Sequence, residues 1–219
     1  MVTKPRRSIL DRLGGAELAI SNARNDAGIL EAVTPFGYDS AGLQAGQDLF
    51  NEVLELVNRQ AALYGDQYEA TQQVEDAREA AEAVYMSALK VARVALRDYE
   101  RAGNALKMNG ERKHSLWGWL EQAQMFYTNL LADDELLAAM ARFGYDRAKL
   151  EDQAILVLAV VNADIAQEGN KGDAQQSTME RDDKLDELDQ WIADFKVIAR
   201  IALEDKPQWL EKLGFGPVP

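Results

Sequence analysis

The chain of 219 residues contains no cysteine and a single histidine, His114. Without cysteine it forms no disulfide, has no thiolate nucleophile and lacks every cysteine-based metal site. The one sequence that resembles a metal-binding motif is Glu111-x-x-His114, and no second histidine exists to complete the site of a di-metal helical bundle. No serine lies in a Gly-x-Ser-x-Gly context, and no glycine-rich phosphate loop is present. We therefore predict a protein that is not an enzyme and that holds no metal and no other cofactor.

Positive charge is also scarce, since 24 lysine and arginine residues face 37 aspartate and glutamate residues, for a net charge of −13. Such a chain repels phosphate backbones and anionic lipids, so we expect neither nucleic acid nor a membrane surface as its partner. The longest apolar run, residues 154–161, is far shorter than the roughly 20 residues that span a bilayer. No secretory signal is recognisable near the start. These features predict a cytoplasmic protein.

Proline is rare, and the interval 36–206 contains none. Because proline costs a helix interior about 3 kcal/mol, its absence leaves this interval free to form long helices. Apolar residues recur at steps of three and four over residues 43–64 and again over 74–99, which is the helical period. No segment alternates apolar and polar residues in the manner of a strand. The chain is therefore predicted to be all-α.

An internal repeat organises the sequence. The tetrapeptide Phe-Gly-Tyr-Asp at residues 36–39 recurs at residues 143–146, an offset of 107. The same offset, without a gap, places Gly65-Asp66 on Gly172-Asp173 and residues 93–96 on residues 200–203. Chance rarely keeps such a register over half a chain. We predict two tandem helical repeats, residues 1–107 and 108–219, packed in one bundle with approximate two-fold symmetry.

The repeated tetrapeptide has a structural explanation. The glycine adopts the left-handed conformation that ends one helix, and the aspartate caps the next helix. The tyrosine between them packs on the leucine five residues later, as a hydrophobic staple. A binding role for the two tyrosines is the alternative. The predicted structural residues of the two copies are Gly37, Tyr38, Asp39, Gly144, Tyr145 and Asp146.

The region around Gly65 and Gly172 allows two interpretations. The apolar period crosses Gly65 without losing phase, so one continuous helix is possible. In the second repeat, however, residues 168–173 are rich in glycine, asparagine and aspartate, which favour turns. We therefore expect a turn at both places, which makes each repeat an αα-hairpin preceded by short helices. Two such hairpins would pack as an elongated four-helix-type bundle.

Residues 154–161 are apolar on every side, and a helix of this kind must be buried on every side. A four-helix bundle leaves each helix one side exposed to solvent. Either the preceding helix around Trp119, Phe126 and Leu130 covers this side or, as we favour, a second copy or another protein does. Trp119 adds a large apolar surface where the first repeat has Arg12. The candidate interface or ligand residues are Trp117, Trp119, Ile155, Leu158, Trp191 and Phe195.

Two functions remain open from the sequence. The first is a non-catalytic helical scaffold or protein-interaction module that binds a protein partner, or a second copy of itself, through repeat 2. The second is a binder of a small apolar ligand, held between the helices of repeat 2 beside the tryptophans. The presence of an apolar cavity of roughly 300 Å³ or more would favour the second.

Overall fold

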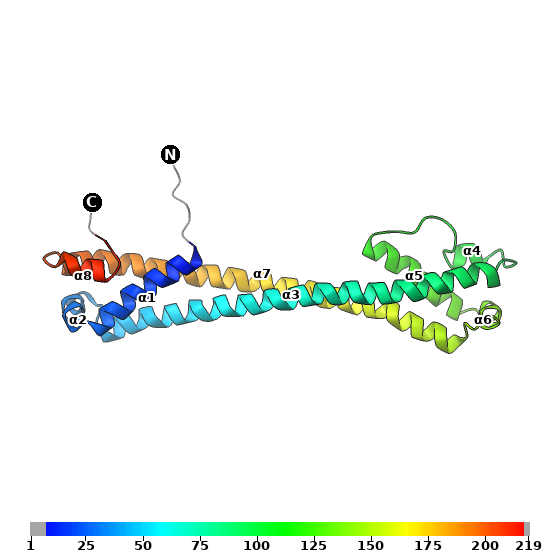
Figure 1. Cartoon of the computed structure of the whole chain (residues 1–219), viewed down its shortest axis with the longest axis horizontal. Helices are drawn as coiled ribbons and strands as arrows, with labels where there is room; N and C mark the ends of the chain where they lie inside the picture. The colour runs from blue at the N-terminus through cyan, green and yellow to red at the C-terminus, as the bar shows by residue number, and fades with distance from the viewer. Residues whose placement is uncertain (1–7, 217–219) are drawn as a thin grey trace, which may run out of the picture. The chain divides into compact units, whose positions relative to one another are not determined.

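The computed structural model describes residues 8–216, and in this range the protein is helical and has no strand, which confirms the all-α prediction. The first seven and last three residues of the predicted repeats lie outside the described range. The described helices, shown in Figure 1, are α1 (Ile9–Asn25), α2 (Ala27–Val33), the 3₁₀ helix η1 (Thr34–Phe36), α3 (Ser40–Ala95), α4 (Ala102–Ala105), α5 (Leu116–Leu131), α6 (Asp134–Ala141), α7 (Arg147–Ala202) and α8 (Pro207–Lys212).

The chain divides into two compact units. Unit 1 combines the chain up to Tyr64 with the chain from Asp173 onward, and unit 2 consists of Gly65–Gly172. Both boundaries fall inside the long helices α3 and α7, so each unit contains part of both helices. The segments 1–107 and 108–219 are therefore not the compact units of the fold, because each unit draws on both of them.

The expected turns at Gly65 and Gly172 are wrong. Helices α3 and α7 have 56 residues each and continue through these glycines. A glycine inside a helix costs only about 1 kcal/mol relative to alanine, far less than a proline. Even the turn-prone segment 168–173 is helical, and Asn170 there donates a hydrogen bond to the backbone oxygen of Asp66 on α3 (3.5 Å). Tertiary contacts of this kind outweigh a local turn preference, because most of the stability of a helix in a protein comes from packing.

The helix bounds keep the offset seen in the sequence. The first and last residues of α7 match those of α3 at this offset, and the first residues of α5 and α6 match those of α1 and α2. A hydrogen bond also recurs with the two helices exchanged. In unit 1 the Gln60 side chain of α3 donates to Thr178 of α7 (2.7 Å), and in unit 2 Gln167 of α7 donates to Thr71 of α3 (2.9 Å). The order of the helices is thus the same in the two halves of the sequence.

Unit 1 packs α1 against parts of α3 and α7. Phe50 and Val53 of α3 meet Leu185 and Leu188 of α7 beneath α1, while Leu43, earlier on α3, shares a second buried cluster with residues later on α7. The two long helices therefore run antiparallel within the unit. Three helical segments, with short helices at their end, replace the expected four-helix bundle, because neither long helix turns back on itself.

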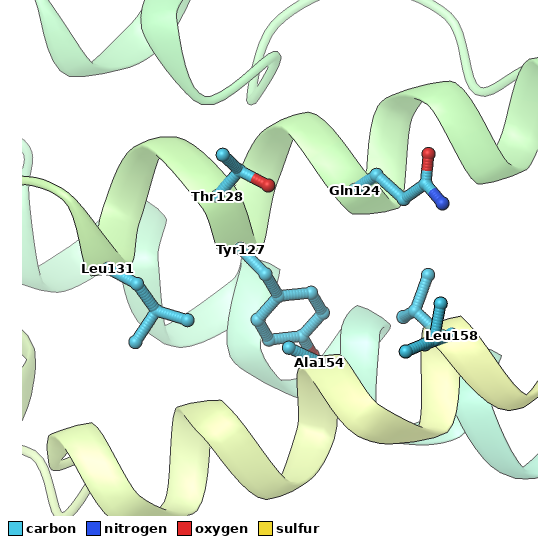
Figure 2. Close-up of a pocket in the computed structure, with 7 residues that line it drawn as sticks. Gln124, Tyr127, Thr128, Leu131, Ala154 and Leu158 are labelled. Atoms are coloured by element: carbon cyan, nitrogen blue, oxygen red, sulfur yellow. The ribbon is translucent and has the colours of Figure 1, made fainter.

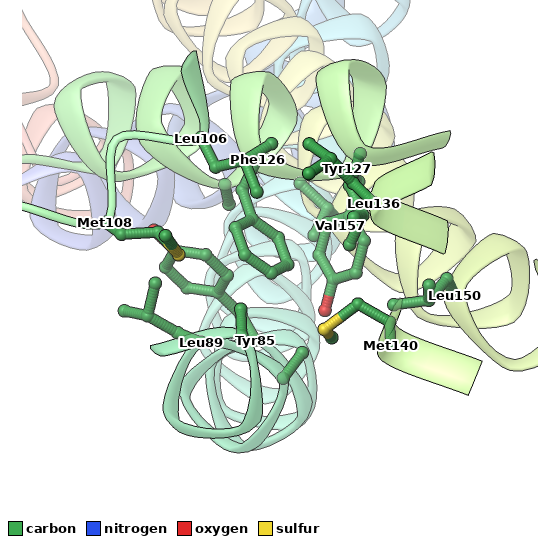
Figure 3. Close-up of a cluster of buried hydrophobic side chains, with 14 of the residues drawn as sticks. Tyr85, Leu89, Leu106, Met108, Phe126, Tyr127, Leu136, Met140, Leu150 and Val157 are labelled. Atoms are coloured by element: carbon green, nitrogen blue, oxygen red, sulfur yellow. The ribbon is translucent and has the colours of Figure 1, made fainter. Parts of the chain in front are cut away.

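Unit 2 has the corresponding arrangement, with α5 against parts of α3 and α7. Its core, shown in Figure 3, contains the aromatic residues Tyr85, Phe126 and Tyr127. The Phe126 ring lies 5.5 Å from that of Tyr85 and 5.1 Å from that of Tyr127, and both pairs are edge-to-face. Such pairs are favourable beyond the apolar area that they bury.

At one pair of matching positions, the large side chain lies on a different helix in each of the two cores. In unit 2 the buried pair is Phe126 on α5 and Ala88 on α3, both in the same cluster. The matching residues of unit 1 are Ala19 on α1 and Phe195 on α7, which are also buried in one cluster. At this pair of matching positions each core thus has one phenylalanine and one alanine, on opposite helices. Volume-conserving exchanges of this kind are the ones that a packed core tolerates best.

The two Phe-Gly-Tyr-Asp segments lie between helices. Gly37 and Gly144 have left-handed backbone angles, with φ of 87° and 77°. Oδ1 of Asp39 accepts hydrogen bonds from the amides of Ala41 (3.0 Å) and Gly42 (2.8 Å), and Oδ1 of Asp146 accepts one from Lys149 (2.9 Å). These contacts satisfy amides that have no partner within the helix.

Replacing Asp39 with alanine is expected to lower the free energy of unfolding by about 1 kcal/mol, because two amides of the first turn of α3 lose their acceptor. Asp39→Asn is the matched control, since asparagine caps a helix about as well as aspartate and should retain most of the stability. Urea denaturation followed by circular dichroism measures both variants. An alanine variant as stable as the wild type would exclude Asp39 as the cap.

Candidate functional site

The six candidate interface or ligand residues belong to different units. Trp117, Trp119, Ile155 and Leu158 lie in unit 2, while Trp191 and Phe195 lie in unit 1. The buried residues Trp119 and Phe195 belong to separate core clusters. Of the four aromatic candidates, two therefore lie in each unit.

Trp191 and Phe195 pack inside unit 1. Phe195 is fully buried, and the two ring centroids are 5.4 Å apart. Tyr38 closes the group, with its ring centroid 5.5 Å from that of Trp191 and 4.9 Å from that of Phe195. Trp191 also covers Gly46 so closely that a Cβ atom there would lie 2.5 Å from the indole ring. These side chains thus pack α3 against α7.

Trp119 has a similar structural role in unit 2. It is buried, its ring lies edge-to-face with Tyr85 at 6.3 Å, and the Arg78 guanidinium lies 5.7 Å from the ring centroid. In unit 1 the same position holds Arg12, which forms ion pairs with Asp186 and Asp189 of α7. Trp119 thus joins α5 to α3 through apolar contact, where α1 is joined to α7 through charge.

The other three candidates are exposed. Trp117 is 63% exposed, Ile155 61% and Leu158 52%. Ile165, which the sequence analysis missed, is 62% exposed. It lies seven residues after Leu158, so it shares one face of α7 with Ile155 and Leu158. Extending the helical spacing by two turns would have found it. We call Ile155, Leu158, Asn162 and Ile165 the α7 face.

A groove of about 280 Å³ lies between α5 and α7, as Figure 2 shows, and Leu158 of the α7 face is among the residues that line it. Tyr127 lies at its floor, between Leu131 on one side and Leu158 on the other. The residues that line it are Gln124, Tyr127, Thr128, Leu131, Ala154, Val157 and Leu158. Apolar side chains, together with the uncharged polar residues Gln124 and Thr128, thus line an open groove along α5 and α7.

The residues that line the groove include one titratable side chain. This side chain is that of Tyr127, its hydroxyl group donates a hydrogen bond to Gln153 (3.2 Å), and burial raises its pKa well above the usual value. A phenol held protonated in this way is no base near neutral pH. Within residues 8–216, no cluster of three or more histidine, cysteine, aspartate or glutamate side chains could hold a metal ion. Over the same range no helix is long and apolar enough to cross a bilayer.

In unit 1, polar side chains occupy positions that match residues of the groove. Arg24, which stands where unit 2 has Leu131, reaches from α1 to Gln44 (2.7 Å) and Gln47 (3.3 Å) of α3. The positions that match the α7 face are also exposed in unit 1, and all four are polar: Asp48, Asn51, Glu55 and Asn58. The same helical surface is therefore an ordinary solvated face in unit 1 and an apolar one in unit 2.

Comparisons of the chain with protein-family models, with curated proteins and with solved structures found no match. We therefore infer a function from the geometry of the groove and the α7 face.

Proposed function

We propose that the protein is a non-catalytic helical scaffold that binds a protein partner through the groove and the α7 face of unit 2. The observation that carries this proposal is the contrast between the two units. Where unit 1 has Asp48, Asn51 and Asn58, unit 2 exposes Ile155, Leu158 and Ile165. Contiguous exposed apolar side chains are typical of interaction sites.

We also propose that the chain arose by tandem duplication of one helical repeat. The gapless offset between the two halves, the glutamine–threonine bond with exchanged helices, and the exchanged phenylalanine and alanine of the two cores support this origin. A duplicated fold lets one copy keep a solvated face while the other copy changes. The apolar α7 face is then an acquired property of unit 2, separate from what the fold requires for stability.

The presence of the groove favours a small apolar ligand as the second candidate, but the size and openness of the groove suit a small molecule less well. The groove volume of about 280 Å³ lies near the lower limit for ligand pockets, which usually enclose most of the ligand surface. The groove is open along its length, and the exposed residues Ile155 and Ile165 extend the apolar surface beyond it. A small molecule would leave these side chains uncovered.

Replacing Leu158 with aspartate tests whether the α7 face serves binding rather than folding. We expect the variant to fold, with a loss of less than about 1 kcal/mol in the free energy of unfolding, because the side chain is half exposed. Asn51→Asp places the same charge at the matching position of unit 1 and is the control. The buried neighbour Val157, changed to aspartate, should prevent folding of unit 2.

Circular dichroism and urea denaturation measure these three variants. A Leu158→Asp variant that unfolds like Val157→Asp would mean that Leu158 belongs to the core, and the interaction surface would be rejected. Native mass spectrometry of freshly purified protein provides the complementary measurement. One equivalent of a tightly bound small molecule or metal ion would contradict the scaffold proposal, whereas a mass equal to that of the polypeptide alone or with a protein partner agrees with it.

A further inference from the structure

We infer that the groove and the α7 face bind one amphipathic helix of another protein, with apolar anchors on one face and lysine or arginine on the other. This inference rests on the proposed function and specifies the partner's chemistry. Three observations support it: the spacing of the exposed residues, the area that they present, and the charge around them.

The spacing suits a helix. Along the α7 face, the steps between Ile155, Leu158, Asn162 and Ile165 are three, four and three residues, the pattern of a coiled-coil seam. On α5, Trp117 lies seven residues before the groove residue Gln124 and therefore on the same side of that helix. Two neighbouring helices thus present lines of side chains with a groove between them, the surface on which an amphipathic helix docks.

The apolar area is large enough for one docked helix. The four exposed apolar side chains, Trp117, Ile155, Leu158 and Ile165, are between half and two thirds accessible and together present on the order of 500 Å². The α7 face from Ile155 to Ile165 is about 15 Å long at 1.5 Å per residue. This length matches about three turns of a bound helix and exceeds what a small molecule would cover.

The charge favours a basic partner. The chain carries a net charge of −13, and residues 150–170 of α7 contain four acidic side chains and no basic one. Glu151 pairs with Arg147 (3.7 Å) and Glu168 with Lys171 (3.6 Å), so part of this charge is balanced at the two ends of the segment. A second copy would bring the same acidic surface against itself, whereas lysine and arginine are attracted to it.

Asn162 adds a constraint on the partner. It occupies a seam position between Leu158 and Ile165 and is exposed. A single polar residue in an apolar seam fixes the register of the helix that packs against it. The partner helix should therefore carry a polar side chain at the matching turn.

The test uses a fluorescein-labelled synthetic peptide long enough for about five helical turns. It has leucine at helical steps of three and four, one central asparagine, and lysine elsewhere. Fluorescence anisotropy with the full chain should show saturable one-to-one binding. A scrambled peptide of the same composition should bind at least about tenfold more weakly, because charge alone does not create an apolar face. The same leucine pattern with glutamate in place of lysine should also bind at least about tenfold more weakly.

Leu158→Asp should weaken binding of the leucine–lysine peptide by at least about tenfold. The added negative charge would by itself attract lysine, so this loss reports the apolar contact. Asn51→Asp, the matched change in unit 1, should leave the affinity unchanged. Ile165→Asp is the second variant, because this side chain is 62% exposed and lies outside the residues lining the groove.

Three outcomes would overturn the inference: equal binding of the scrambled peptide, no saturable binding of the leucine–lysine peptide, or no loss of affinity in folded Leu158→Asp and Ile165→Asp. Sedimentation velocity tests a further possibility, namely that a second copy of the chain covers the α7 face. A wild-type dimer that Leu158→Asp converts into a folded monomer would show that a second copy covers the face, which rejects the separate helix but keeps the interaction surface. An unfolded Leu158→Asp would instead reject the proposed function itself.

Discussion

Replacing Phe126 with alanine is expected to lower the free energy of unfolding by about 3–5 kcal/mol. The side chain is fully buried at the centre of unit 2, and its ring contacts Tyr85 and Tyr127 edge-to-face. Removing it loses both the apolar burial and the aromatic contacts, and it leaves a cavity that a close-packed core fills only in part. Urea denaturation followed by circular dichroism measures the loss. A cost below about 1 kcal/mol would contradict the packing described for this core.

The core of unit 1 suggests a specific rescue of this variant. There the matching positions hold alanine on α1 and Phe195 on α7. Ala88→Phe alone should overpack unit 2 and cost about 1–3 kcal/mol. Combined with Phe126→Ala it reproduces the arrangement of unit 1, and we expect the double variant to be more stable than Phe126→Ala alone. Additive losses in the double variant would show that the two cores do not share one geometry.

Gly65→Pro and Gly65→Ala should change the stability in opposite directions. Proline at residue 65 removes a hydrogen bond inside α3 and clashes with the carbonyl group of Ala61, so we expect a loss of about 3 kcal/mol or more. Alanine should instead stabilise the protein by about 0.5–1 kcal/mol, since glycine is a poor helix former. No atom lies within 4 Å of a Cβ added at Gly65, so nothing opposes this gain.

Thermal and urea denaturation of the two variants check this pair, and Gly172→Ala repeats the test on α7, where the added Cβ also meets no atom within 4 Å. A turn at residue 65 would reverse the pattern. Proline would then be tolerated, and alanine at a position that needs a left-handed backbone would destabilise the protein. The opposite signs of the two effects make this the most direct measurement of helix continuity.

Helical periodicity and the scarcity of proline correctly predicted an all-α chain, because apolar spacing and the lack of helix-breaking residues act locally. The prediction of a turn at Gly172 was wrong for a physical reason. Glycine, asparagine and aspartate disfavour a helix by up to about 1 kcal/mol each, and contacts with the other long helix, such as that of Asn170 with Asp66, outweigh this cost. The local turn preference can be read from the sequence, but the helix that packs against this segment is known only from the structure.

The candidate site was predicted in part. Apolar character all round residues 154–161 identified Ile155 and Leu158, and the structure leaves both of them exposed. The same reasoning grouped them with Trp119 and Phe195, which are buried in separate units. Hydrophobicity alone does not distinguish a core residue from an interface residue. Comparing matching positions in the two halves of the chain distinguishes them better, since an apolar residue that matches an exposed aspartate or asparagine lies where the fold tolerates a polar side chain.

Continuity of the two long helices determines the order in which the chain can fold during synthesis. Unit 2 is a single uninterrupted segment, Gly65–Gly172, whereas unit 1 needs residues on both sides of it. Unit 2 can therefore become compact as soon as its own residues have emerged, but the residues before Tyr64 must wait for those after Asp173. Once unit 2 has formed, the contact of Asn170 with Asp66 holds its two ends side by side. This shortens the loop that unit 1 must close and so lowers the entropic cost of its assembly.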